Sequence, residues 1–111
     1  MKNILFLLLF LLTSSCISTP PSSSTSTQSS VSPETQARKR TAEMKSVLGL
    51  NATQEERVLI INVVNFSLLK KLRESNQTSQ IPQTKEKYRA EIKEVLNSDQ
   101  YATFLQQFGD L

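Results

Sequence analysis

The sequence predicts an all-α protein, with a small four-helix domain that follows an N-terminal signal and a flexible tether. Two observations predict this. Apolar residues after position 32 recur at helical spacing in four segments. In addition, two short motifs of the form Leu-Asn-x-x-Gln each follow one predicted helix and open the next. The domain is therefore expected to consist of two helix–corner–helix units over residues 33–111.

The N-terminus has the parts of a bacterial lipoprotein signal. Lys2 supplies a short positive region, and residues 4–12 form a continuous apolar run of Leu, Ile and Phe. That run is well short of the ~20 residues that a membrane-spanning helix needs. Small residues at 13–15 lead into Cys16, the only cysteine. We expect residues 1–15 to be a signal peptide and Cys16 to be lipidated; the alternative is an ordinary secretory signal beside an unrelated cysteine.

Lipidation would fix both the anchor and the compartment. The thiol of Cys16 would become a thioether at the first residue of the mature protein. A single acyl chain gives only marginal membrane binding, and stable anchoring takes more than one chain. A triacylated cysteine would meet that requirement. The next residue is Ile17, not the Asp that favours inner-membrane retention in the enterobacterial sorting rule. The predicted localisation is therefore the cell envelope, lipid-anchored at the outer membrane and facing the periplasm.

Residues 16–32 combine the lipidated cysteine with a Ser/Thr/Pro-rich tether. The sixteen residues from Ile17 to Ser32 carry no charge and almost no apolar side chains. Such a segment cannot bury enough surface to offset the entropy lost on ordering. As a flexible coil it would span roughly 20–24 Å on average. The domain is therefore expected to stand off the membrane.

The first helix is predicted over residues 33–48. Ser32 suits the N-cap position, Pro33 suits the first helical position, and Gly49 suits the position after the helix. An apolar stripe at helical period runs along Ala37, Thr41, Met44 and Leu48.

The second helix is predicted to run from the first corner to about Ser75. Its centre is rich in β-branched residues, which also favour strands, but it does not alternate as a half-buried strand would. Its apolar arc is wider than one helix contact needs. One stripe comprises Ile61, Val64, Leu68 and Leu72. The adjacent stripe of Leu59, Val63 and Phe66 is our candidate binding surface, with core or a dimer interface as the alternative.

Two further helices follow a polar loop at residues 76–80. The third is predicted over about 83–96, with Tyr88, Ile92 and Val95 at helical spacing. The fourth carries Tyr101, Phe104, Leu105 and Phe108 on one face and ends at Gly109.

The two corner motifs lie 46 residues apart. In each, an apolar residue anchors the corner, an Asn caps the following helix, and a Gln three residues later returns the hydrogen bond, which makes a capping box. The motif residues are Leu50, Asn51, Gln54, Leu96, Asn97 and Gln100.

This pair of motifs resembles the LTxxQ family of periplasmic proteins, the Spy/CpxP group, whose signature Leu-Thr-x-x-Gln typically occurs twice in an all-helical fold. The second copy, continued by Tyr101-Ala-Thr-Phe-Leu, is the more similar, and both copies have Asn where the family has Thr. The resemblance implies a role in envelope stress. Some members are ATP-independent chaperones, cradle-shaped dimers that hold unfolded clients on a concave, basic and partly apolar face, and others restrain a stress-sensing kinase. It also implies that the corner residues are structural.

No catalytic constellation is present in the sequence. The chain has no His, and its single Cys is assigned to lipidation, so the common nucleophile–base pairs are missing. We therefore predict that the protein is not an enzyme and has no cofactor and no metal site. The acidic pairs Glu55–Glu56 and Glu91–Glu94 are predicted to be solvated charges, and so are the basic residues of the third helix: Lys85, Lys87, Arg89 and Lys93.

The charge pattern bears on partners. A formal net charge of +3 is too small to indicate nucleic-acid binding. The densest basic run is Arg38-Lys39-Arg40, which either docks to an anionic lipid or acidic client or forms a solvated helix face.

The predicted function is a membrane-anchored periplasmic binding module of the Spy/CpxP type, which contacts unfolded clients or a protein partner. The alternative is a small structural or scaffolding envelope lipoprotein with one specific partner. The 79 residues from Pro33 to Leu111 contain no cysteine and lie near the lower limit for a self-sufficient core. A homodimer is one way to enlarge that core.

Overall fold

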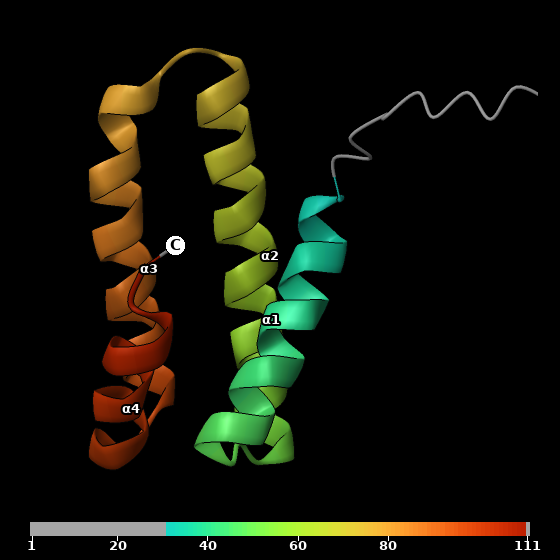
Figure 1. Ribbon diagram of the computed structural model, residues 1–111, viewed down its shortest axis with the longest axis vertical. Coiled ribbons are helices and arrows are strands. Elements are labelled where there is room, and N and C mark those ends of the chain that lie inside the picture. Colours follow the sequence, from blue (N-terminus) through green and yellow to red (C-terminus); the bar gives the residue numbers. More distant parts are fainter. Residues whose placement is uncertain (1–30, 111) are drawn as a thin grey trace, which may run out of the picture.

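A computed structural model describes residues 31–110, which fold into four α-helices and one short 3-10 helix, with no strand in that range (Figure 1). The predicted all-α, four-helix fold is confirmed. The signal peptide, Cys16 and most of the tether lie outside the described residues. The elements are α1 (Pro33–Leu48), α2 (Ala52–Glu74), η1 (Thr78–Gln80), α3 (Ile81–Val95) and α4 (Ser98–Phe108).

The helices form two hairpins with both corners at one end of the bundle. Figure 1 shows α1 and α2 meeting at one corner and α3 and α4 at the other, both at the bottom of the view, while α2 connects to α3 at the opposite end. The fourth helix has 11 residues, whereas α1 has 16 and α3 has 15. It therefore covers only the part of the bundle nearest the corners.

The connection from α2 to α3 is tighter than predicted. Asn76 adopts a left-handed conformation with φ of 60°, which Asn tolerates better than most residues. The amide of Gln77 donates to the carbonyl of Leu72 at 2.8 Å and closes the end of α2. The 3-10 turn then leads directly into α3, whose first turn holds Pro82. As a result α3 begins at Ile81 instead of residue 83.

Both corners contain complete capping boxes. The side chain of Asn51 accepts from the amide of Gln54 at 2.8 Å, and the side chain of Gln54 accepts from the amide of Asn51 at 3.1 Å. Asn97 and Gln100 repeat the arrangement with the same two distances. Each box satisfies two of the amides that the start of a helix leaves without intrahelical partners.

The two corners are joined to each other by their glutamines. Gln54 Nε2 donates to Gln100 Oε1 at 2.8 Å, and Gln100 Nε2 donates back to Gln54 Oε1 at 3.2 Å. Each amide also donates to a carbonyl at the end of a helix in the other hairpin: Gln54 to Val95 at 3.1 Å, and Gln100 to Leu48 at 3.2 Å. The internal sequence repeat thus becomes a reciprocal contact in three dimensions.

The face that α2 buries differs from the predicted stripe. Its buried residues are Val58, Asn62, Asn65, Phe66, Leu69 and Leu72. Of the stripe that indicated a helix, Leu72 is buried, whereas Val64 is 55% exposed. The core face of α2 instead includes two asparagines, Asn62 and Asn65. A search for apolar residues at helical spacing does not detect them, because they are polar.

Both asparagines are buried with hydrogen-bond partners for their side-chain amides. Tyr88 donates its hydroxyl to Asn62 Oδ1 at 2.7 Å, and Asn62 Nδ2 donates to Thr41 Oγ1 at 2.8 Å. Asn65 Nδ2 donates to the carboxylate of Glu91 at 2.8 Å. Among the described residues, every buried side-chain nitrogen and oxygen has a hydrogen-bond partner. The Asn62 network therefore joins α1, α2 and α3 within the core.

Two predictions for α3 need correction. Glu91 is half-buried and accepts from Asn65, so it is not a freely solvated charge. Arg89 is not a freely solvated charge either, because its guanidinium donates twice to the carbonyl of Gly109, at 2.7 and 2.9 Å. This contact fixes the end of α4 against α3.

The paired glutamines give a first testable prediction. Replacing either one (Gln54→Ala or Gln100→Ala) should lower the free energy of unfolding by about 1–3 kcal/mol. The reason is that the side-chain amide of the other glutamine, which is partly buried, would lose its hydrogen-bond partner. The double variant should cost less than the sum of the two, with a coupling of about 0.5–1.5 kcal/mol. Urea unfolding followed by circular dichroism measures all three values. Gln106→Ala, at an exposed position on α4, is the control, and strict additivity would contradict a coupled pair.

A second prediction concerns pH. Burial raises the pKa of Tyr88 well above its ordinary value, and the charge of Arg40 opposes that shift only in part. The folded protein therefore keeps the phenol neutral, whereas the unfolded chain ionises it near its ordinary pKa of about 10. This contribution to stability is complete below about pH 10 and is lost above it, by about 1.4 kcal/mol per pH unit. Unfolding curves should show a steeper alkaline loss for the unaltered chain than for Tyr88→Phe; parallel losses would contradict the shift.

Candidate functional site

A cavity of about 330 Å³ lies on one side of the seam between α1 and α2. We call it the basic groove. It is lined by Gln36, Lys39, Arg40, Glu43, Phe66, Leu69 and Arg73.

The basic groove exists because α4 is short. The ring of Phe108, the last residue of α4, lies 5.5 Å from the guanidinium of Arg40, which also lines the groove. Arg89 holds the carbonyl of Gly109 just beyond that end. Gln36 and Lys39 precede Arg40 on α1, so the groove continues along α1 past the point that α4 reaches.

The groove combines an apolar floor with a cationic rim. Phe66 and Leu69 of α2 form the floor and are 9% and 3% exposed. Lys39, Arg40 and Arg73 contribute three positive charges, against the single negative charge of Glu43. An apolar body with polar or charged groups at its edge is typical of binding pockets. This arrangement suits an apolar segment that carries acidic groups.

The floor of the groove is supported by the buried polar network. The ring of Phe66 lies 6.3 Å from that of Tyr88, whose hydroxyl is held by Asn62. Tyr88 in turn lies 6.0 Å from Phe104 of α4. Because close-packed interiors resist displacement, the groove is a preformed surface.

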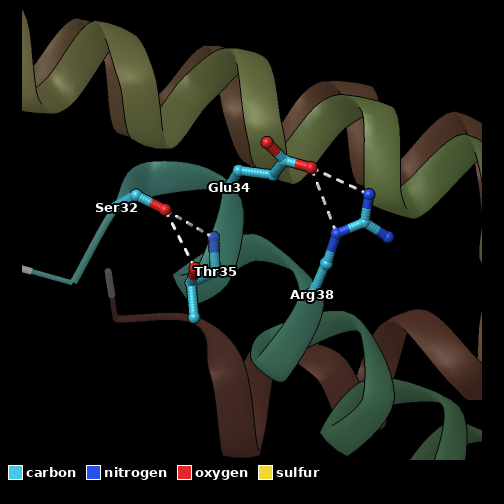
Figure 2. A network of polar contacts seen from close by, with 4 residues as sticks. All are labelled: Ser32, Glu34, Thr35 and Arg38. Carbon is cyan, nitrogen blue, oxygen red and sulfur yellow. Dashed lines mark hydrogen bonds and ion pairs between the residues drawn. The ribbon is translucent and has the colours of Figure 1, made fainter.

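A second cavity, of about 340 Å³, lies on the other side of the α1–α2 seam. Its lining has one basic residue, Arg38, and two acidic ones, Glu55 and Glu56. Figure 2 shows Arg38 turned toward Glu34, to which it donates at 2.8 and 3.2 Å, beside the N-cap contacts of Ser32. The one cation in this lining is therefore already paired, and the second cavity has no comparable charge preference.

The structure distributes the predicted binding residues instead of gathering them. Phe66 lies in the floor of the basic groove, and Leu59 lines the second cavity. Val63 is half-buried against the cluster formed by Ala37, Phe66 and Leu69. The three side chains follow the α1–α2 seam, so they do not make one exposed contact surface.

The basic run of α1 is likewise divided, with Lys39 and Arg40 on the groove and Arg38 on the second cavity. The sequence analysis did not predict Arg73 as a groove residue, because Arg73 lies far along the chain from the basic run that it joins in the groove. The corner residues lie at the other end of the bundle and serve as structural contacts.

Between residues 31 and 110 no cluster of His, Cys, Asp or Glu is placed to hold a metal ion. Within the same residues, no helix is long and apolar enough to cross a membrane.

Comparison with known families shows which family the chain belongs to. Residues 22–104, about three quarters of the chain, match the model of a family described as Domain of unknown function (DUF4890). The chain belongs to this family. The match covers the last part of the tether segment, α1 to α3, both corner motifs and α4 as far as residue 104. No curated protein and no solved structure matches the chain. Its resemblance to the Spy/CpxP group therefore stays a prediction.

Proposed function

We propose that this DUF4890 protein is a membrane-anchored periplasmic binding module, held by lipidated Cys16, whose basic groove takes apolar segments with acidic flanks from unfolded or partner proteins. The observation that carries the proposal is the groove itself, an apolar floor of Phe66 and Leu69 beneath three cations. The lipoprotein signal supplies the anchor, and the paired corner motifs supply the likeness to envelope-stress chaperones and sensor modulators.

The size of the groove limits what it holds. Ligand pockets usually enclose about 300–1,000 Å³, and 330 Å³ lies at the small end of that range. Such a site takes a short segment and not a folded domain. Its affinity would come from a few buried apolar side chains, while the rim charges would select acidic neighbours and speed association.

A second function also has an observation in its favour. Promiscuous binding surfaces are commonly flexible, rich in Met or built from loops. The basic groove lies between two helices over a floor fixed by the Asn62 network. That rigidity suits a scaffold lipoprotein with a single complementary partner.

A client assay separates the two functions. The full chain, reconstituted in vesicles, should reduce the aggregation of two unrelated denatured proteins, measured by light scattering. The double variant Lys39→Glu with Arg73→Glu should lose most of that effect and weaken binding of a labelled acidic amphipathic peptide by about tenfold, or about 1.4 kcal/mol. It reverses two rim charges at exposed positions without altering the core.

The matched control is Arg57→Glu with Lys71→Glu, which makes the same change in net charge at exposed positions on α2 outside the groove. It should bind the peptide as the unaltered chain does. Equal losses in the two double variants would show a general charge effect and contradict a specific groove. Peptide binding without suppression of either client would reject the chaperone and favour the single-partner scaffold.

A further inference from the structure

The side of α2 that faces away from the groove carries its own pattern. Ile60 and Val64 are one helical turn apart and are 57% and 55% exposed. Arg57 precedes them and Lys71 follows them, both exposed and both on the same side of the helix at about 100° per residue. Together with exposed Ser67 these residues form what we call the outer face of α2. It is an apolar centre with a cation at each end.

Acidic residues near this face are directed elsewhere. Glu74 lies 3.6 Å from Lys70, with which it pairs, and Glu56 lines the second cavity. Leu68, also half-exposed, extends the apolar centre toward Lys71. The outer face therefore has a net positive character along about 21 Å, the rise of fourteen helical residues.

This charge pattern disfavours a second copy as the occupant. An antiparallel pair of outer faces centred on Val64 would set Arg57 of each copy against Lys71 of the other. A parallel pair would set each cation against itself. Both arrangements bring like charges together across an apolar contact, which is unfavourable. A surface that is negative throughout satisfies both ends at once.

We propose that the outer face of α2 rests on the anionic lipid surface of the membrane to which the chain is anchored. This rests on the proposed anchor at Cys16. Apolar side chains of a surface helix enter the boundary between headgroups and acyl chains, while Lys and Arg reach the phosphates. Each cation near such a surface strengthens the attraction. The contact is small, but the anchor proposed at Cys16 would keep the face near the membrane and so at high effective concentration.

The docked orientation has a consequence for the groove. Leu69 in the groove floor lies nine residues from Ile60, and nine residues turn an α-helix through roughly 180°. The floor and the outer face are therefore opposite sides of one helix. With the outer face on the lipid, the basic groove opens toward the aqueous side and stays accessible to proteins.

Tryptophan fluorescence tests this orientation, because the chain contains no Trp of its own. Ser67→Trp places a probe on the outer face, and Gln106→Trp places one at an exposed position on α4. The full chain is reconstituted in vesicles of phosphatidylethanolamine and phosphatidylglycerol with brominated acyl chains, which quench a nearby indole. The probe at position 67 should be quenched much more strongly than the one at position 106, and this difference should shrink in neutral phosphatidylcholine.

The two charge-reversal variants then exchange roles. Arg57→Glu with Lys71→Glu should reduce the docking equilibrium by more than about 30-fold, the loss expected from removing two cations alone, because each new carboxylate is also repelled. It should remove the excess quenching at position 67. Lys39→Glu with Arg73→Glu should leave it in place.

Vesicle flotation in the same samples separates the anchor from the orientation. A chain that floats but is quenched equally at both positions overturns the orientation alone. A chain that does not float overturns the anchor and the orientation together. Shielding of the Ser67→Trp probe in detergent, with a dimer mass by sedimentation, would assign the outer face to a second copy and overturn the lipid contact.

Discussion

The contact on which the fold depends is the pair of side-chain amides formed by Gln54 and Gln100. Each glutamine returns the capping bond of its own helix, bonds to the other glutamine and donates to a helix-ending carbonyl. A change in one corner therefore disturbs the other. Because the pair closes the bundle at the corner end, the length of each helix decides how far it extends from the corners. The short α4 then leaves the space along α1 that becomes the basic groove.

The buried polar network has a complementary role. Burying Asn62 would be costly without partners, since an unsatisfied polar group loses its hydration without compensation. Its partners Thr41 and Tyr88 come from different helices, so the cost is avoided only when α1, α2 and α3 share one register. Apolar contacts are non-directional and so select one arrangement less sharply than hydrogen bonds do. The network therefore specifies the arrangement that holds Phe66 and Leu69 as the groove floor.

Local patterns in the sequence predicted local structure well. The bounds of α1, both corner motifs and the four helices follow from caps, turn residues and periodicity, which act over a few positions. The faces of α2 did not follow, because Asn62 and Asn65 count as polar in any pattern while Ile60 and Val64 count as apolar. The burial of the two asparagines depends on Thr41, Tyr88 and Glu91, which are 21 to 26 residues away. The basic groove was hidden for the same reason, since Arg73 meets Lys39 and Arg40 only across the α1–α2 seam.

Net charge conceals how the cations are arranged. A total of +3 gives no reason to expect a strongly anionic partner, yet α2 carries cations on two opposite sides. Arg73 faces the groove, whereas Arg57 and Lys71 lie on the outer face with exposed apolar residues between them. Ile60 and Val64 are more than half exposed and so contribute little to the buried core. The wide apolar arc of α2 thus divides between two sides of the helix. Leu59, Val63 and Phe66 follow the seam with α1, whereas Ile60 and Val64 lie on the exposed outer face that we propose meets the membrane.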